Sequence, residues 1–228
     1  MYKGGCMKEI LRDFYENGQP RNIIPYKNGF KHGVAYWYNE SGENMTKTKY
    51  KKGKKHGVEK HYISGDLFLK IPFKKGKKHG VEKEYCKNGY IKKETQYDMG
   101  IKQGMEILYF DNGNVNELTQ YDKGKRHGAW KWYGISGTLR GEATFNMGRY
   151  NGIKKEYHSN GILESEKEFE NDKFNGIYKV YHENGSLSLD FYYKDDKKHG
   201  IWKEYDESGN LIKESIYENG ILIKERAC

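Results

Sequence analysis

Aromatic side chains recur along the chain at an almost constant interval of 24 residues. Nine glycines, from Gly18 to Gly209, end Asn-Gly or Ser-Gly dipeptides, and the residue eight positions after each is Tyr or Phe. Eight more glycines, from Gly33 to Gly200, close turns of the Lys-x-His-Gly kind, and a Tyr follows each of them five positions later. One interval in each series is 23 residues, which indicates a single deletion. This self-similarity predicts a repeat architecture.

Each unit is predicted to contain two short strands and two turns. The first strand runs from the Lys-x-His-Gly glycine to its Tyr, as in Ala129–Tyr133, and the second ends at the later aromatic residue, as in Leu139–Phe145. Helix signals are nearly absent, and only Glu9–Tyr15 suits a short helical turn. We therefore expect an all-β fold: an elongated meander of about eight 24-residue β-hairpin repeats in a single twisted antiparallel sheet.

The alternation of side chains predicts which residues face inward. In the first strand the inward set is predicted to stand one, three and five positions after the glycine, as do Ala129, Lys131 and Tyr133. In the second strand it is predicted to include Leu163 and Phe169. Side chains alternate with a period of two, so the two sets share one face only if the loop has an odd length. A three-residue loop that ends in a glycine with positive φ satisfies this condition.

The Tyr and Gly positions of these units resemble those of a known repeat. The pattern Y-x-x-G-K-x-x-G-x-x-x-x-Y-x-x-x-G, which runs from Tyr121 to Gly137, resembles MORN repeats. It is more similar to the variant MORN repeat of bacterial antitoxin-like proteins of the YwqK type. The chain departs from the pattern at Trp130, where a second glycine is usual, and at Asp172 and Asp196, which replace turn glycines. We expect these two turns to differ in shape.

The repeat pattern also suggests how the chain is organised. Residues 1–25 are predicted to be an N-terminal cap, residues 26–217 the tandem repeats, and residues 218–228 a C-terminal cap strand, all within one elongated domain. Repeat arrays need such terminal caps because their end units have a neighbour on one side only.

Composition and charge narrow the class of protein. The apolar share is 35% and the mean hydropathy is −1.06, which suits an extended array better than a compact globule. An aromatic share of 15% argues against disorder. Cys6, Cys86 and Cys228 suggest no disulfide framework, and no signal peptide or membrane-spanning segment is recognised. We therefore expect a soluble cytoplasmic protein.

The positive charge is concentrated in the first half. Residues 1–114 carry 23 Lys and Arg against 13 Asp and Glu, and residues 115–228 carry 18 against 19. Two Lys-rich turns dominate the basic half and supply the candidate anion contacts, namely Lys51, Lys52, Lys54, Lys55, Lys74, Lys75, Lys77 and Lys78. These lysines either bind an anionic surface or only keep the array soluble, and the charge by itself does not separate the two interpretations.

Four tryptophans depart from the regular pattern and are the candidate partner contacts, namely Trp37, Trp130, Trp132 and Trp202. The last three are predicted to lie on the face opposite the aromatic rows. Trp dominates binding hot spots, so these residues suit the anchoring of a partner protein. Packing against the neighbouring hairpin is the alternative.

No residue set predicts catalysis, a cofactor or a metal ion. Five histidines recur at the same turn position, namely His32, His56, His79, His127 and His199. Successive units lie two strands apart, roughly 9.5 Å, which is too far for a shared zinc ion with bonds of about 2.0–2.1 Å. No nucleophile elbow, P-loop or HExxH motif is present, so the chain is not predicted to be an enzyme.

These observations favour a protein–protein interaction module. The resemblance implies an antitoxin or immunity-like protein that occludes a toxin or effector. The alternative is a MORN-like scaffold that binds an anionic membrane surface, with anionic lipid as the partner. A hydrolase with an unrecognised site has no motif in its support, nothing indicates specific nucleic-acid binding, and the oligomeric state stays open.

Overall fold

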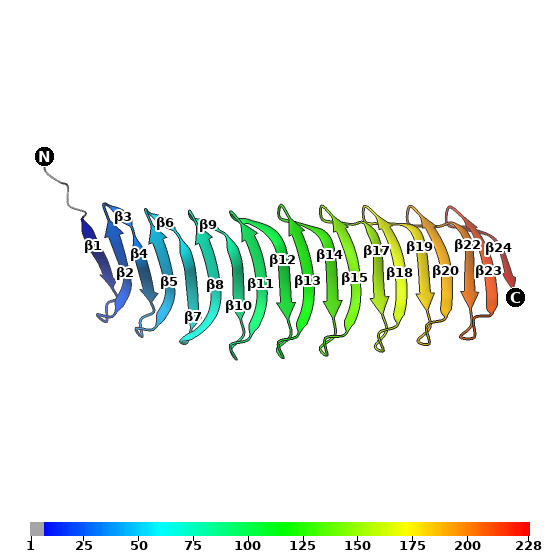
Figure 1. Ribbon diagram of the computed structural model, residues 1–228, viewed down its shortest axis with the longest axis horizontal. Helices are drawn as coiled ribbons and strands as arrows, with labels where there is room; N and C mark the ends of the chain where they lie inside the picture. The colour runs from blue at the N-terminus through cyan, green and yellow to red at the C-terminus, as the bar shows by residue number, and fades with distance from the viewer. Residues whose placement is uncertain (1–6) are drawn as a thin grey trace. The chain divides into compact units, whose positions relative to one another are not determined.

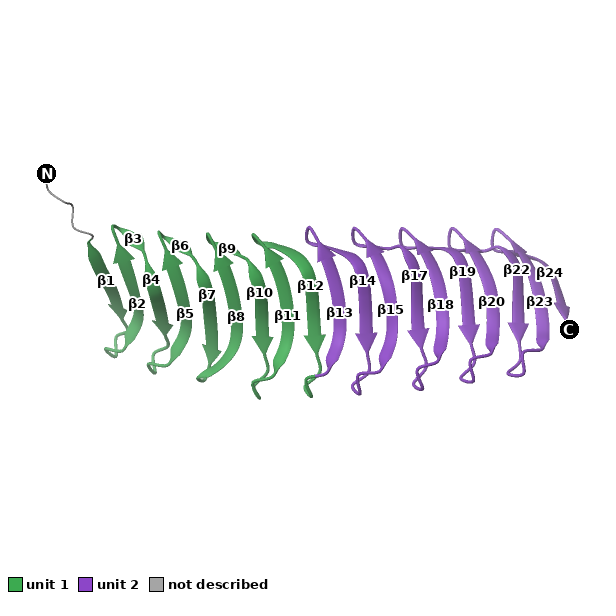
Figure 2. Cartoon of the chain, in the orientation of Figure 1, with its two compact units in different colours: residues 1–113 green, residues 114–228 purple. Residues whose placement is uncertain are grey.

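Every regular element that the structure describes is a β-strand. The computed structural model describes residues 7–228, and no helix occurs among them (Figure 1). The chain divides into two compact units, Met1–Gly113 and Asn114–Cys228 (Figure 2). The predicted all-β hairpin meander is thereby confirmed.

The first unit is an antiparallel meander in which strands that follow one another in the chain pair. Its strands are β1 (Lys8–Phe14), β2 (Pro20–Lys27), β3 (Phe30–Lys31), β4 (Gly33–Tyr38), β5 (Asn44–Lys51), β6 (Lys54–Lys55), β7 (Gly57–Ile63), β8 (Asp66–Lys74), β9 (Lys77–Lys78), β10 (Gly80–Tyr85), β11 (Ile91–Asp98) and β12 (Ile101–Tyr109). The two-residue strands pair near the turn, and the longer strand after each pairs further along the same neighbour.

The second unit repeats this arrangement. Its strands are β13 (Val115–Asp122), β14 (Lys125–Tyr133), β15 (Leu139–Asn146), β16 (Arg149–Tyr150), β17 (Gly152–Tyr157), β18 (Leu163–Glu170), β19 (Lys173–Tyr181), β20 (Leu187–Lys194), β21 (Lys197–Lys198), β22 (Gly200–Tyr205), β23 (Leu211–Glu218) and β24 (Ile221–Ala227).

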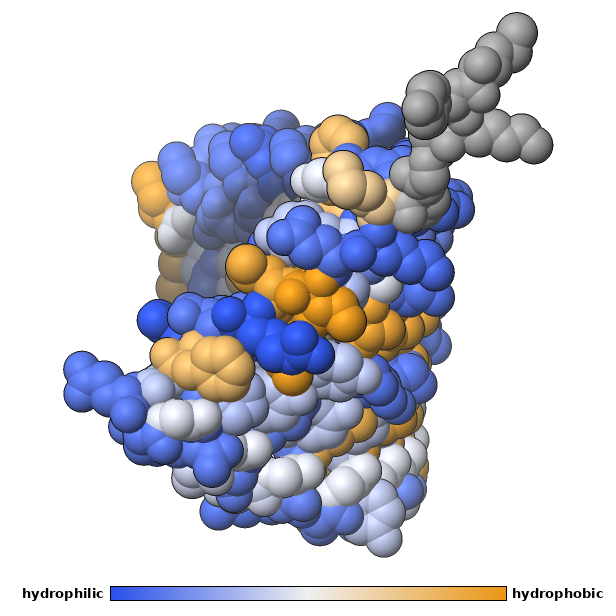
Figure 3. Space-filling model, turned by 90° about the vertical axis from the view of Figure 1, so that its left-hand side faces the viewer, coloured by the Kyte–Doolittle hydropathy of each residue, from blue (hydrophilic) through white to orange (hydrophobic). Residues whose placement is uncertain are grey.

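The stretch that suited a helical turn is the strand β1. It pairs with β2 from Lys8 opposite Lys27 to Phe14 opposite Pro20, and this pairing supplies the backbone partners that a helix would otherwise provide. Figure 3 looks onto the end of unit 1 at β1 and shows apolar side chains gathered there. Leu11 and Phe14 of this strand are 48% and 55% exposed. Residues 1–6 of the predicted cap, with Cys6, lie outside the described residues.

The predicted three-residue loop is confirmed. In the loop Glu16–Gly18, the Tyr15 N–H donates to the Gln19 carbonyl oxygen at 2.8 Å, and Gly18 has a φ of +81°. The unit with the deletion has a two-residue loop instead, because Ile63 pairs with Asp66 around Ser64 and Gly65. The missing residue is therefore removed from the loop, and the strands keep their length.

At the opposite ends of the strands, the hairpins close through two-residue turns. Lys52 and Gly53 show the usual conformation, with φ of +50° and +78°, which is typical of a type I′ turn. Asp172 and Asp196 adopt the same left-handed conformation, with φ of +73° and +63°. The expectation of a different turn shape is therefore wrong, since Asp tolerates this region of φ and ψ better than most residues do.

The predicted placement of both aromatic rows on one face is also wrong. In the hairpin β14–β15, Trp132 lies opposite Gly141 whereas Tyr133 lies opposite Leu139, so Arg140 is an extra residue in β15. This bulge shifts the alternation by one position in every such hairpin. Tyr133 and the later aromatic residue of the same hairpin, Phe145, consequently lie on opposite faces.

The two faces of the sheet can now be defined. Face A carries the aromatic residue that stands eight positions after each Asn-Gly or Ser-Gly glycine, as does Phe145, and also Trp130 and Trp132. Face B carries Lys131 and Glu142, which lie opposite one another. Buried residues of both units lie on face A, namely Ile24, Ala35, Thr48, Glu59, Ile71, Glu82, Thr95, Glu106, Thr119, Ala143, Phe145, Ser165, Phe191, Trp202 and Ser215.

Candidate binding surfaces

Face A of unit 2 is built from a ladder of aromatic rings. The ring centroids of Phe145, Tyr150, Phe169, Phe174 and Tyr193 follow one another at 4.3, 5.3, 4.6 and 5.3 Å, with interplanar angles between 29° and 32°. The rings come from β15, β16, β18, β19 and β20. Such cross-strand ring pairs stabilise a sheet by roughly 0.5–1.5 kcal/mol each beyond the area they bury.

The four tryptophans belong to face A, which corrects the predicted placement of three of them away from the aromatic ladder. The Trp202 ring stacks at 3.9 Å on Phe191 and is 7% exposed. The Trp130 and Trp132 rings lie 4.4 Å apart, and both residues are half-buried. Trp37 is half-buried at 6.4 Å from the Tyr50 ring. Their role as partner contacts stays a prediction.

Face A of unit 1 contains buried carboxylates where unit 2 has rings. The Glu59 carboxylate accepts hydrogen bonds from the Thr48 hydroxyl at 2.7 Å and from Lys55 Nζ at 2.5 Å, and lies 2.9 Å from His61 Nε2. Burial by itself raises the pKa of Glu59, but the hydrogen bonds from Lys55, Thr48 and His61 outweigh this effect and lower the pKa. The ionised carboxylate therefore stabilises the folded unit.

The same arrangement recurs two 24-residue repeats later, within unit 1. Glu106 accepts hydrogen bonds from Lys102 Nζ at 2.6 Å and from the Thr95 hydroxyl at 3.0 Å. Burial raises its pKa, and these hydrogen bonds lower it further than burial raises it. Glu82 forms an ion pair with Lys78 in the 24-residue repeat between these two.

Two of the predicted anion contacts are therefore engaged within the sheet. Lys55 and Lys78 lie on face A beside Glu59 and Glu82. Their ammonium groups also lie 4.9 Å and 4.8 Å from the ring centres of aromatic residues in the next hairpin. We assign these two lysines to the stabilisation of unit 1.

Four of the other predicted anion contacts belong to face B of unit 1, where Lys51 pairs with Lys54 and Lys74 pairs with Lys77. Four lysines stand opposite one another on four consecutive strands: Lys47 of β5 opposite Lys60 of β7, Lys60 opposite Lys70 of β8, and Lys70 opposite Lys83 of β10. We call these four residues the lysine row. Like charges directly opposite in a sheet are destabilising, so the row costs folding free energy.

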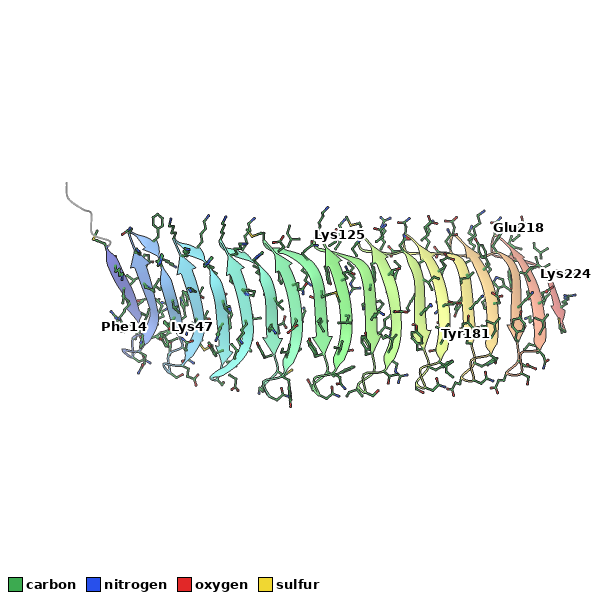
Figure 4. The ribbon with its side chains drawn as sticks, viewed as in Figure 1. Phe14, Lys47, Lys125, Tyr181, Glu218 and Lys224 are labelled. Carbon is green, nitrogen blue, oxygen red and sulfur yellow. The ribbon has the colours of Figure 1, made fainter. Side chains whose placement is uncertain are left out.

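Only one end of the lysine row has an acidic partner. Lys83 Nζ lies 2.7 Å from Glu94, and the hydrogen bond to Glu94 raises the pKa of Lys83. Lys47 and Lys70 lie over the rings of Tyr36 and Tyr85, at 5.5 and 5.4 Å from their centres (Figure 4 labels Lys47). Within residues 7–228 no carboxylate forms an ion pair with the first three lysines of the row.

Further lysines extend the row towards the turns. From β5 to β10, face B carries Lys47, Lys49, Lys51, Lys54, Lys60, Lys70, Lys74, Lys77 and Lys83. We call this set the lysine face, and no carboxylate belongs to it on these described strands. Next to it lies a hollow of about 370 Å³ lined by Lys51, Lys52, Lys54, His56 and Lys75. The structure thus brings four of the predicted anion contacts around one hollow.

Face B of unit 2 has the same ladder with alternating charge. Opposite one another on successive strands lie, in order, Lys131, Glu142, Lys155, Glu166, Lys179, Asp190, Lys203, Glu214 and Arg226. Lys131 Nζ is 2.8 Å from Glu142, and the hydrogen bond from Lys131 lowers the pKa of that carboxyl group. The acid of this ladder stands where Lys47 and Lys70 stand in unit 1.

None of the four residues of the lysine row was among the predicted anion contacts, although the sequence holds the signal. Five positions after the Asn-Gly or Ser-Gly glycine, unit 2 has Glu142 and Glu166, whereas unit 1 has Lys47 and Lys70. Comparing this single column across the repeats would have found the change of charge. The column was overlooked because the predicted inward face did not include it.

The tyrosines of face B bind these acids. Tyr181 donates a hydrogen bond from its hydroxyl to Glu166 at 2.9 Å, and Tyr157 donates one to Glu142 at 3.2 Å (Figure 4 labels Tyr181). Burial, followed by the hydrogen bond to Glu166, raises the pKa of Tyr181 to about 12. These two tyrosines therefore stabilise the alternating charges on face B of unit 2, and neither is a reactive phenolate.

The recurrent histidines act separately. His79 Nδ1 lies 3.0 Å from Asp98, and His127 Nδ1 accepts a hydrogen bond from the Met147 N–H at 3.4 Å. Residues 7–228 contain no group of His, Cys, Asp and Glu arranged to hold a metal ion. In this part of the chain, no helix is long and apolar enough to cross a bilayer. Cys86 and Cys228 are free thiols.

Comparisons with known proteins match part of the repeat array. Residues 10–28, 150–171, 174–195 and 198–219 match the model of the MORN repeat variant, which confirms the resemblance at these four stretches. No curated protein matches the chain. Among solved structures, a porin-like protein from Bacteroides uniformis is 9% identical over 96% of this chain and 93% of that chain. Its TM-score is 0.21, so this likeness carries no argument about fold or function.

Proposed function

We propose that the chain is a non-enzymatic β-repeat scaffold that binds an acidic partner protein through the lysine face of unit 1. The observation that carries this proposal is the lysine row, in which Lys60 stands between Lys47 and Lys70 with no carboxylate beside it. Folding alone favours the alternating charges of unit 2. A surface of uniform positive charge lowers the stability of the free protein, and it is expected where an anionic partner offsets the repulsion between the lysines on binding.

An antitoxin or immunity-like role is the specific form of this proposal. Its support is the resemblance of the Tyr and Gly pattern to the variant MORN repeats of antitoxin-like proteins, together with a basic surface that is complementary to an acidic toxin or effector. The scaffold would act by covering the partner's active surface, which requires no catalytic group of its own. The free thiols of Cys86 and Cys228 favour a reducing, cytoplasmic site of action.

Co-expression tests this function. Each neighbouring reading frame is expressed alone and together with this chain, and cell survival is measured. We expect one neighbour to be toxic alone and harmless with the wild-type chain. The variant Lys47→Gln/Lys60→Gln/Lys70→Gln should fail to protect, whereas Lys155→Gln/Lys179→Gln should protect fully. Equal protection by both variants would show that the lysine face is not the binding surface.

Binding to an anionic membrane is the second candidate, and the same lysine face supports it, because a basic patch is attracted to anionic lipid by about 1 kcal/mol per cation near the surface. Flotation with vesicles that contain phosphatidylserine, at low and high salt, tests this candidate. A membrane scaffold would float at low salt and be released at high salt. Absence from the vesicle fraction at low salt would remove this candidate and leave the protein partner.

A further inference from the structure

The lysine row has a regular geometry that restricts the shape of its ligand. Its four residues belong to adjacent strands, which lie about 4.8 Å apart, so the row extends for roughly 14 Å across the strands. The two rings beneath Lys47 and Lys70 hold their ammonium groups in place. All four lysines are half-buried, so their stems lie on the sheet and the charges form a line.

A line of carboxylates on an α-helix has nearly the same spacing. Residues at i, i+3, i+7 and i+10 lie on one side of a helix, and with a rise of about 1.5 Å per residue they extend for roughly 15 Å. An extended strand presents side chains on one face about every 6.8 Å, which fits the row less well. Glutamates at this helical spacing therefore match the spacing of the lysines in the row, of which Lys47, Lys60 and Lys70 form no ion pair within residues 7–228.

We infer that the lysine row of unit 1 is a docking site for an acidic α-helix of the partner protein, which lies across β5, β7, β8 and β10. This inference rests on the proposed function, since it specifies the element that an acidic partner presents. The helix fits the row better than a lipid surface does, because exposed large apolar side chains for insertion into a bilayer are scarce on this face. Among the described face B residues of these four strands, Val58 is the one large apolar side chain that is exposed, at 46%.

The position of the row within the unit also favours a narrow ligand. Glu94 follows the row on β11 and pairs with Lys83, so the uniform positive charge ends there. On the other side Tyr36 of β4 stands opposite Lys47. The docking site is therefore about as wide as four strands, which matches three turns of a helix.

Two synthetic helical peptides test the inference on the full-length protein. Both are capped and rich in Ala and Gln, and both contain four glutamates. In the aligned peptide these stand at i, i+3, i+7 and i+10, and in the dispersed peptide they are spread around the helix. Binding is measured by fluorescence anisotropy at low salt. We expect the aligned peptide to bind about tenfold more tightly than the dispersed one, as several correctly placed charge pairs imply.

Matched variants locate the binding. Lys60→Gln/Lys70→Gln should abolish the preference for the aligned peptide. Lys155→Gln/Lys179→Gln, which also removes two lysines but at the unit 2 positions that correspond to Lys60, should retain it. The first variant removes repulsive pairs, so it should fold, and circular dichroism checks this. Equal binding of both peptides would overturn the helix inference while the acidic partner of the proposed function stands. Binding of vesicles or DNA with no binding of either peptide would overturn both.

Discussion

Replacing Lys60 by Glu should make the protein more stable while weakening its binding surface. In the wild-type chain Lys60 stands between Lys47 and Lys70, and both neighbours repel it. The substitution turns two like-charge pairs into two opposite-charge pairs. Its mirror image exists in the same molecule, because Lys155 stands between Glu142 and Glu166, where Lys155→Glu creates two like-charge pairs from two favourable ones.

The size of the effect follows from the exposure of these positions. Cross-strand charge pairs contribute roughly 0.2–1 kcal/mol, and half-exposed pairs lie towards the lower end because water screens them. Two pairs that change sign should therefore stabilise Lys60→Glu by about 1 kcal/mol and destabilise Lys155→Glu by about the same amount. For a chain of this length, about 1 kcal/mol corresponds to a change of about 2–4 °C in the unfolding midpoint.

Thermal and urea unfolding of the wild type and both variants, at low salt and in 1 M NaCl, measure this prediction. Both variants change the net charge equally, so a general charge effect would shift both midpoints in the same direction. We expect shifts of opposite sign that shrink in 1 M NaCl, where the Debye length falls to about 3 Å. Shifts of the same sign, or a Lys60→Glu variant that is less stable than the wild type, would refute the argument from the charge ladder.

Three further predictions concern the scaffold. A Cβ added at Gly141 would overlap the Trp132 ring, so Gly141→Ala should cost about 2 kcal/mol or more in urea unfolding and shift the tryptophan fluorescence. Gly134→Ala, where the added Cβ meets only a flexible side chain, should cost far less. The pKa of Tyr181 is raised to about 12, so the neutral phenol stabilises the fold below pH 10, and this stability is lost as pH rises towards 12. Tyr181→Phe should therefore make the loss of unfolding free energy at alkaline pH less steep. An unchanged slope would contradict this prediction. The pKa of Glu59 is lowered in the folded protein, so the ionised carboxylate stabilises the fold above about pH 4.5, and this stability is lost as pH falls through the lower folded pKa. Glu59→Gln should be less stable than the wild type at neutral pH, and its unfolding free energy should fall less steeply in acid. Equal slopes would count against the assigned hydrogen bonds.

The local structure could be predicted from the chain because it depends on short-range chemistry. Gly18 has the positive φ that its loop requires, and the alternation of apolar and polar residues marks the strands. The turns at Asp172 and Asp196 show where this reasoning failed. Their carboxylates accept hydrogen bonds from backbone N–H groups of the preceding 24-residue repeat, at 2.7 and 2.8 Å. These contacts between neighbouring repeats favour the left-handed conformation that a glycine would adopt without help.

The candidate surface needed the tertiary structure. Whether Lys55 is free to bind an anion depends on Glu59, which stands four residues later and meets it only because both lie on face A. Lys47 and Lys70 are 23 residues apart in the chain, and they belong to one row because Lys60 stands opposite both of them. Pairing between strands brings these residues together, and no periodicity within one strand reveals which neighbours they meet.

The sequence by itself determined the repeat, the strands, the loops and the excess of positive charge in the first half, since each depends on residues close together in the chain. Only the tertiary structure decided which face each residue occupies. The physical reason is one extra residue per hairpin, such as Arg140, which reverses the alternation between one aromatic row and the next. That reversal places the tryptophans on the buried face and leaves the lysine row on the open one.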